Sequence, residues 1–124
     1  MEMIGDTDLT RRIIQCSFKV HNALGPGFHE RVYHKALIVA FKEKCIEFDT
    51  EKTFNVFYES EKVGQFRLDL LVENKVVVEI KALANAVPII FHHQVLSYLK
   101  ISNLKVALLV NFGAKSCQIK RFVN

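Results

Sequence analysis

Two apolar segments joined by a polar turn make up the sequence FRLDLLVENKVVVEIK, which runs from Phe66 to Lys81. Their branched and aromatic residues, with polar side chains at alternate positions, are typical of β-strands. The residues between them, Glu73-Asn74-Lys75, favour a turn. We therefore predict an antiparallel strand pair, around which the rest of the chain is organised.

The register of this pair determines which side chains meet, because a slip of one residue turns a whole face over. A turn made of Asn74 and Lys75 alone would set the apolar face of one strand beside the polar face of the other. A turn that also includes Glu73 pairs Val72 with Val76 and makes the two apolar faces coincide. Asn is tolerated in the left-handed conformation that such a turn needs. The longer turn is therefore expected.

In this register Asp69 lies directly opposite Glu79. The alternation then places two sets of side chains on opposite faces, Arg67, Leu71, Val77 and Lys81 with the two acids, and Phe66, Leu68, Leu70, Val72, Val76, Val78 and Ile80 on the other. Two carboxylates about 5 Å apart repel each other unless a cation lies between them. Their hard oxygen atoms suit Mg²⁺ or Mn²⁺, which can activate water against a phosphodiester. Lys81 could position that water or neutralise charge on the phosphate.

A simpler interpretation of Asp69, Glu79 and Lys81 is a salt bridge on a solvated sheet face, since these residue types are common. Leu71 and Val77 on the same face are too apolar for full exposure to water. This favours a covered pocket over a wet surface.

The remaining pattern predicts one α/β domain over residues 1–124, in the order α-α-β-β-β-α-β-β. Apolar residues at helical spacing indicate two helices joined by Gly25-Pro26-Gly27, and a third helix after Pro88. The predicted helices cover residues 8–24, 29–44 and about 88–101, and the predicted strands cover residues 54–58, 63–72, 76–81, 106–111 and 117–122. Helices packed on a central sheet are the natural architecture for this order.

Composition bounds the function only loosely. The net charge of +4 and pI near 9.0 are compatible with a polyanionic partner. Three scattered cysteines without a CxxC pair argue against a disulfide framework or a zinc knuckle and favour a reducing cytoplasm. No apolar stretch reaches membrane-spanning length, and the N-terminus lacks the pattern of a secretory signal, so we expect no membrane association.

Several other residues are candidates for the same site. Gln94 and Tyr98 are one helical turn apart and share a face of the third predicted helix. Arg67 could pair with Asp69 or reach a phosphate. Glu30 could be a site carboxylate or simply an acid that stabilises its helix dipole, and Tyr33 could contact it or pack in the core.

Five segments together carry a resemblance. They are GFHERVY from Gly27, FRLDLLV from Phe66, VEIK from Val78, QVLSYL from Gln94 and LVNFG from Leu109. In this order they resemble the PD-(D/E)XK nuclease superfamily, and within it the small GxxExxY family, which is close to RecB-like nucleases. The proline that precedes the first acid in the superfamily is replaced here by Leu68.

The resemblance implies a restriction-endonuclease-like core, in which a mixed central sheet is flanked by helices. It also implies a metal ion held by both acids and further ligands, and groups that contact substrate. The implied metal ligands are Asp69, Glu79, the backbone carbonyl of Ile80 and Glu30; the implied catalytic residues are Asp69, Glu79, Lys81 and Gln94; and the substrate-binding candidates are Tyr98, Arg67 and Tyr33.

We therefore expect a Mg²⁺- or Mn²⁺-dependent nuclease that hydrolyses phosphodiester bonds, with DNA as the favoured substrate. The alternative is a nuclease-like fold that binds nucleic acid or a protein partner without hydrolysis. A core this small, with no separate recognition element, is expected to need a homodimer mate or a protein partner to hold its substrate.

Overall fold

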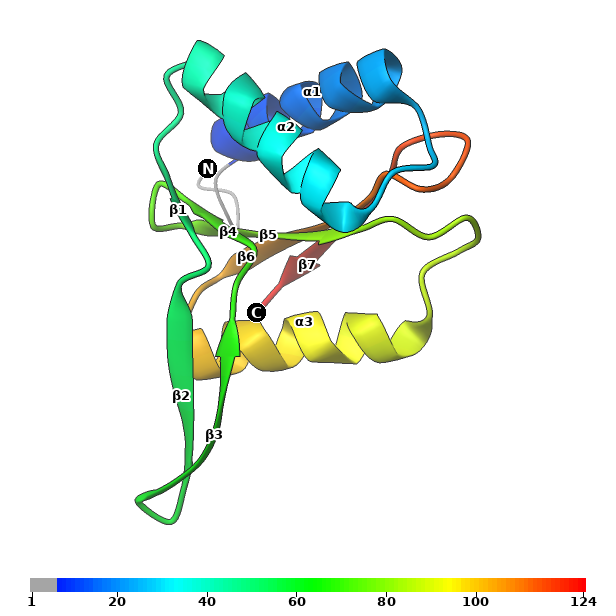
Figure 1. Ribbon diagram of the computed structural model, residues 1–124. Coiled ribbons are helices and arrows are strands. Elements are labelled where there is room, and N and C mark those ends of the chain that lie inside the picture. Colours follow the sequence, from blue (N-terminus) through cyan, green and yellow to red (C-terminus); the bar gives the residue numbers. More distant parts are fainter. Residues whose placement is uncertain (1–6) are drawn as a thin grey trace.

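Five strands form a mixed sheet in the order β1-β4-β5-β6-β7, and a separate hairpin pairs β2 with β3 (Figure 1). The computed structural model describes residues 7–124, so Met1–Asp6, where the sequence shows no secretory signal, lie outside the described residues. The elements are α1 (Thr7–Leu24), α2 (Glu30–Glu43), β1 (Phe48–Thr50), β2 (Thr53–Tyr58), β3 (Glu61–Arg67), β4 (Leu70–Val72), β5 (Val76–Lys81), α3 (Ile89–Ser102), β6 (Val106–Asn111) and β7 (Gln118–Val123). The predicted α/β architecture is confirmed.

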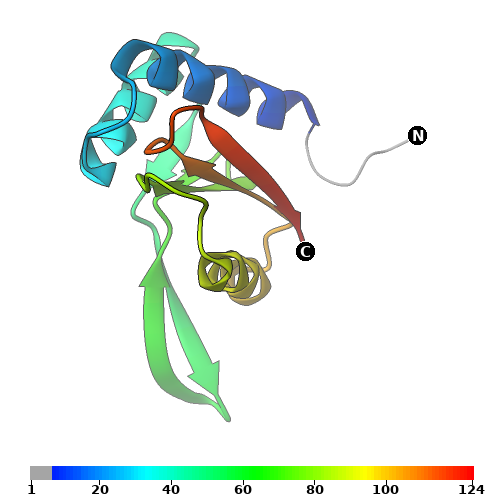
Figure 2. The ribbon, with the colours of Figure 1, turned by 90° about the vertical axis from the view of Figure 1, so that its right-hand side faces the viewer.

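Helices cover both faces of the sheet, with α1 and α2 on one face and α3 on the other (Figures 1 and 2). Each face has its own core. Leu70, Val78 and Ile80 pack with α1 and α2, whereas Leu71 and Val77 pack with α3. Strands β5 and β6 are parallel and α3 connects them, while the other neighbouring strands of the sheet are antiparallel. Because β5 and β6 are buried on both faces, they are almost uninterrupted apolar runs.

The expected register of the central pair is confirmed. Val72 pairs with Val76 and Leu70 pairs with Val78 across β4 and β5. The turn between them uses left-handed backbone at Glu73 (φ 48°) and Asn74 (φ 58°). Matching the apolar faces therefore selected the longer turn.

The strand predicted over residues 63–72 is wrong in one respect, because it breaks into β3 and β4 at Leu68 and Asp69. The break shifts the alternation, so that Phe66 and Leu68 pack on the α3 side with Leu71 instead of opposite it. The short strand β1, absent from the prediction, pairs with β4 and forms one edge of the sheet. At three residues it is too short to show a period.

The β2–β3 hairpin projects away from the sheet, beside and beyond α3 (Figures 1 and 2). Its turn is tighter than predicted, because Tyr58 pairs directly with Glu61 and the left-handed residues Glu59 and Ser60 lie between them. The hairpin is anchored to the body where Phe54 stacks on Phe66 at 5.6 Å between ring centroids. Among residues 7–124, no helix is long and apolar enough to cross a membrane.

Candidate active site

Asp69 and Glu79 lie side by side on the α3 side of the sheet, and each carboxyl group accepts a hydrogen bond from the backbone of the other's segment. The Asp69 carboxylate accepts a hydrogen bond from the Ile80 backbone N–H at 2.8 Å. The Asp69 backbone N–H donates in turn to Glu79 Oε1 at 3.3 Å. Asp69 lies at the strand break, one residue before the β4–β5 ladder begins, so its side chain is free to replace a strand partner for Ile80. The convergence expected from the register is therefore present in the structure.

The environment of Glu79 favours its protonated form. Its side chain is only 6% exposed. Burial raises the pKa of the Glu79 carboxyl well above its usual value of 4.5, and the charge of Asp69 and a hydrogen bond between the two carboxyl groups raise it further. The Asp69 backbone N–H and the charge of Lys81 act in the opposite direction but do not reverse the shift. The two neighbouring carboxyl groups thus favour keeping a proton at Glu79. A bound cation could take the place of that proton.

Lys81 lies on the same face at the end of β5. Its Nζ sits 4.1 Å from the centre of the Phe91 ring, in the first turn of α3. An ammonium over an aromatic face gains a cation–π attraction while keeping its N–H donors available. Phe91 therefore holds Lys81 beside the acids without neutralising it. Nothing in the sequence pattern singles out Phe91, because an aromatic residue on a helix that packs against a sheet usually indicates core packing.

Helix α3 carries two of the predicted site residues, Gln94 and Tyr98. Tyr98 stacks on Phe66 at 4.2 Å between ring centroids. Burial raises the pKa of the Tyr98 hydroxyl, and the nearby charges of Glu79 and Asp69 add to this rise, so the hydroxyl stays a proton donor at neutral pH. Gln94 is exposed, one turn before Tyr98 and one turn after Phe91 on the same helix. Gln94 thus shares a helix face with Phe91 and Tyr98 and is open to solvent.

Two residues expected from α2 do not join the acids. Tyr33 is fully buried and stacks on Phe112 at 4.9 Å, and its hydroxyl donates to the Gly25 carbonyl at 2.6 Å. Tyr33 therefore packs in the core, which is one of the two roles that the sequence left open for it, while its neighbour Val32 is 39% exposed. Glu30 is exposed at the start of α2. In the described part of the chain, no group of three or more acidic, His or Cys residues is close enough to hold a metal ion, so Glu30 is not a third ligand in this structure.

Arg67 ends β3 two residues before Asp69 and is exposed. The sequence allowed an ion pair between Arg67 and Asp69, but this pair is not formed. Among the described residues, the salt bridge present joins Arg11 to Asp8. The Arg67 side chain is therefore exposed near the strand break that precedes Asp69.

The buried residue Asn111 holds the backbone that follows Lys81 in place. Asn111 Oδ1 accepts hydrogen bonds from the backbone N–H of Leu83 at 2.8 Å and of Gly113 at 3.1 Å. Its Nδ2 donates to the Leu83 carbonyl at 3.0 Å and to Gln118 Oε1 at 3.0 Å. Asn111 thereby fixes the chain that leaves β5 directly after Lys81. Its place at the end of an apolar strand, within the LVNFG segment, was the sequence signal of this role.

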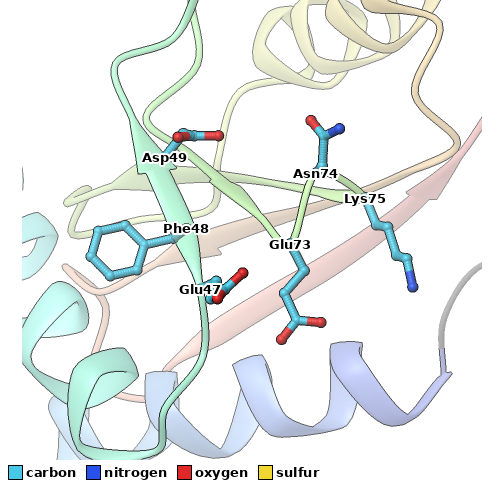
Figure 3. A pocket seen from close by; sticks show the side chains of 6 residues that line it. All are labelled: Glu47, Phe48, Asp49, Glu73, Asn74 and Lys75. Carbon is cyan, nitrogen blue, oxygen red and sulfur yellow. The ribbon is translucent and has the colours of Figure 1, made fainter.

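Two hollows in the surface differ in their relation to the acids. A groove of about 570 Å³ lies between the β2–β3 hairpin and the C-terminal half of α3, and Phe66 and Tyr98 are part of its wall. A hollow of about 640 Å³ lies at the opposite end of β5, around the β4–β5 turn; it is lined by Glu47, Phe48, Asp49, Glu73, Asn74 and Lys75 (Figure 3). The second hollow lies at the start of β5, away from Asp69 and Glu79. The groove is therefore the one that adjoins the candidate site.

Comparison with known proteins agrees with this geometry. Residues 7–122 match the family described as the PD-(D/E)XK nuclease superfamily. The crystal structure of SSO0001 has a similar fold, with a TM-score of 0.60 at 20% identity over 77% of this chain and 50% of that chain. The chain thus spans half the length of that solved protein, and at this identity the likeness shows the fold alone. The comparison with curated proteins found no match. Because the family match covers nearly the whole chain, this protein belongs to the PD-(D/E)XK nuclease superfamily.

Proposed function

We propose that the protein is a Mg²⁺- or Mn²⁺-dependent nuclease that hydrolyses phosphodiester bonds of DNA, and that within its superfamily it belongs to the GxxExxY group. The observation that carries this proposal is the carboxyl pair formed by half-buried Asp69 and buried Glu79, next to the unneutralised ammonium of Lys81. The three free thiols, Cys16, Cys45 and Cys117, fit a reducing cytoplasm.

The residues present fit a hard divalent cation. Mg²⁺ is usually held by one or two carboxylates and keeps its other positions for water and phosphate. Asp69, Glu79 and the Ile80 backbone carbonyl would supply the protein ligands. Glu30 could be recruited only if the start of α2 moved. A bound cation would polarise a phosphoryl oxygen and lower the pKa of an attacking water molecule.

The protein's own groups then divide the remaining tasks. Lys81, held over Phe91, can donate hydrogen bonds to the water or to a phosphate oxygen that gains charge. The protonated Tyr98 hydroxyl and the Gln94 amide can donate to the phosphate backbone beside the scissile bond. Arg67 can hold a phosphate at the rim of the site as a bidentate donor.

The test is to titrate Mn²⁺ and Mg²⁺ calorimetrically into the wild type and the Asp69→Asn variant, and to assay plasmid and single-strand cleavage on the same samples. Asn keeps an oxygen that can accept the Ile80 N–H but removes the charge. Asp49→Asn, at an exposed position of β1, is the matched control. We expect Asp69→Asn to lose metal binding and cleavage together while its melting temperature stays near that of the control.

Cleavage by Asp69→Asn at the wild-type rate would exclude this mechanism. The Lys81→Met variant separates binding from chemistry, because it should still take up Mn²⁺ but lose cleavage. Parallel assays on DNA and RNA of the same sequence then decide the substrate.

One observation favours the alternative of a non-hydrolytic module that binds nucleic acid or a protein partner, including a second copy of the chain. The projecting hairpin exposes three large apolar side chains, with Phe57 at 60%, Tyr58 at 70% and Val63 at 62%. A catalytic core acting alone has no use for such a patch. Salt-sensitive binding of nucleic acid, or a concentration-dependent dimer, without any metal-dependent cleavage would support this alternative.

A further inference from the structure

The strand break leaves the backbone carbonyl of Asp69 outside the β4–β5 ladder. That ladder begins with Leu70 and Val78, so Asp69 has no partner across the strand. Three donors converge on its carbonyl oxygen instead. His34 Nε2 lies at 3.0 Å, the Glu51 backbone N–H at 3.3 Å and Thr50 Oγ1 at 3.5 Å. The shortest of these contacts comes from a side chain of a helix on the far face of the sheet.

His34 reaches this carbonyl from the middle of α2. The neighbouring residues Tyr33 and Leu37 anchor α2 in the core formed with α1, so the position of His34 is fixed by packing. A contact between Nε2 and a carbonyl oxygen requires that Nε2 carries the proton and donates. Thr50 Oγ1 lies 3.2 Å from the same Nε2, so His34, Thr50 and the Asp69 carbonyl form one cluster. His34 is half-buried, so this contact is shielded on one side from competing water.

The two sides of Asp69 are thus held from opposite layers. Its side chain is tied to Ile80 and its backbone N–H to Glu79 on the α3 side, whereas its carbonyl is tied to His34 on the α2 side. Rotation of the Asp69 peptide would move the carboxylate away from Glu79. Groups that orient a metal-binding carboxylate commonly change affinity or activity about 10- to 100-fold when they are removed.

We propose that His34 is a positioning residue for the catalytic site: its Nε2–H holds the Asp69 peptide so that the carboxylate stays paired with Glu79. The role rests on the proposed nuclease function. It does not require His34 to touch the metal or the substrate, and it depends on the hydrogen bond that His34 donates.

The experiment compares His34→Gln, whose amide can donate from nearly the same place, with His34→Leu, which cannot. The exposed neighbour Lys35→Leu is the matched control on α2. Mn²⁺ affinity is measured by calorimetry, and kcat and KM for DNA at saturating Mn²⁺. The third measurement is the exchange rate of the Ile80 amide, whose acceptor is the Asp69 carboxylate, relative to that of Val78 within the ladder.

We expect His34→Leu to lose about tenfold or more in Mn²⁺ affinity and kcat, with little change in KM, and to speed exchange at Ile80 but not at Val78. His34→Gln should recover most of each loss. Equal behaviour of the two variants, whether both are impaired or both resemble the wild type, would overturn the proposal. If His34→Leu does not fold, Thr50→Val tests the same cluster, with faster exchange confined to Ile80 as the supporting result and unchanged exchange as the opposing one.

The failure of this inference can be told from the failure of the proposed function. A wild type that neither binds Mn²⁺ nor cleaves DNA refutes both. A wild type that does both, alongside a His34→Leu variant that matches it, refutes only the positioning role.

Discussion

Replacing Glu79 by Gln should stabilise the protein while abolishing the proposed metal site. The side chain is 6% exposed and shares its pocket with the Asp69 carboxylate, so an ionised Glu79 is costly in the absence of a cation. A neutral amide of the same shape removes this cost and can still accept from the Asp69 N–H. Stability would thus be given up at this position for the ability to bind a cation.

The size of the effect follows from the geometry. Two unit charges about 5 Å apart repel by about 3 kcal/mol at an effective dielectric constant of about 20. The wild type avoids part of this repulsion by keeping a proton on Glu79, so we expect a gain of about 1–3 kcal/mol for Glu79→Gln near pH 8. For a domain of this size that is roughly 3–5 °C in melting temperature for each kcal/mol.

The pH dependence has a definite sign. Because the pKa of Glu79 in the folded protein is raised above 4.5, the folded state binds more protons than the unfolded state above that pH. This contribution to the free energy of unfolding is fully present below pH 4.5 and is lost as pH rises through the folded pKa. The advantage of Glu79→Gln over the wild type should therefore widen as pH rises from 4.5.

The assay is urea or thermal unfolding with a chelator present, from pH 4 to pH 9, for the wild type, Glu79→Gln and the exposed control Glu47→Gln. Adding Mn²⁺ should reverse the order, stabilising the wild type through binding but leaving Glu79→Gln unchanged. A Glu79→Gln variant that is less stable than the wild type at pH 8, or equally stable at every pH, would refute the reasoning.

Three further predictions concern single residues. A Cβ on Gly113 would lie 2.3 Å from the backbone of Ala82, so Gly113→Ala should lower the free energy of unfolding by about 1–3 kcal/mol or more, as measured by urea denaturation. Tyr98→Phe keeps the stack on Phe66 but loses the hydroxyl donor, so kcat should fall while the melting temperature stays within about 2 °C, since the packing of the ring is unchanged. Arg67→Ala should weaken DNA binding and reduce the slope of log affinity against log salt by about one, measured by fluorescence anisotropy; an unchanged slope would mean that Arg67 does not contact phosphate.

The sequence predicted those parts of the site that follow from strand alternation. The demand that two apolar faces coincide was enough to select the three-residue turn and to bring Asp69 beside Glu79. This worked because register is a local property of two adjacent strands and a short turn. The same logic failed at Leu68, where the strand breaks and the alternation shifts, because breaks depend on what packs against the strand.

Other roles were decided by tertiary contacts between distant segments. Tyr33 and Val32 are neighbours with similar claims to the core, and only the stacking of Tyr33 on Phe112 settles which one is buried. His34 also lies 35 positions from Asp69, and nothing in its own helix marks it as a donor to that carbonyl.

The sequence by itself determined the three helices, most of the strands, the register of β4 with β5, and the pairing of the two acids, since each depends on periodicity within a short stretch of chain. Only the tertiary structure decided the burial that raises the pKa of Glu79, the position of Lys81 over the Phe91 ring and the hydrogen bond between His34 and the Asp69 carbonyl. Those three properties arise from side chains that meet across layers, and periodicity along one strand or helix carries no information about what the next layer brings.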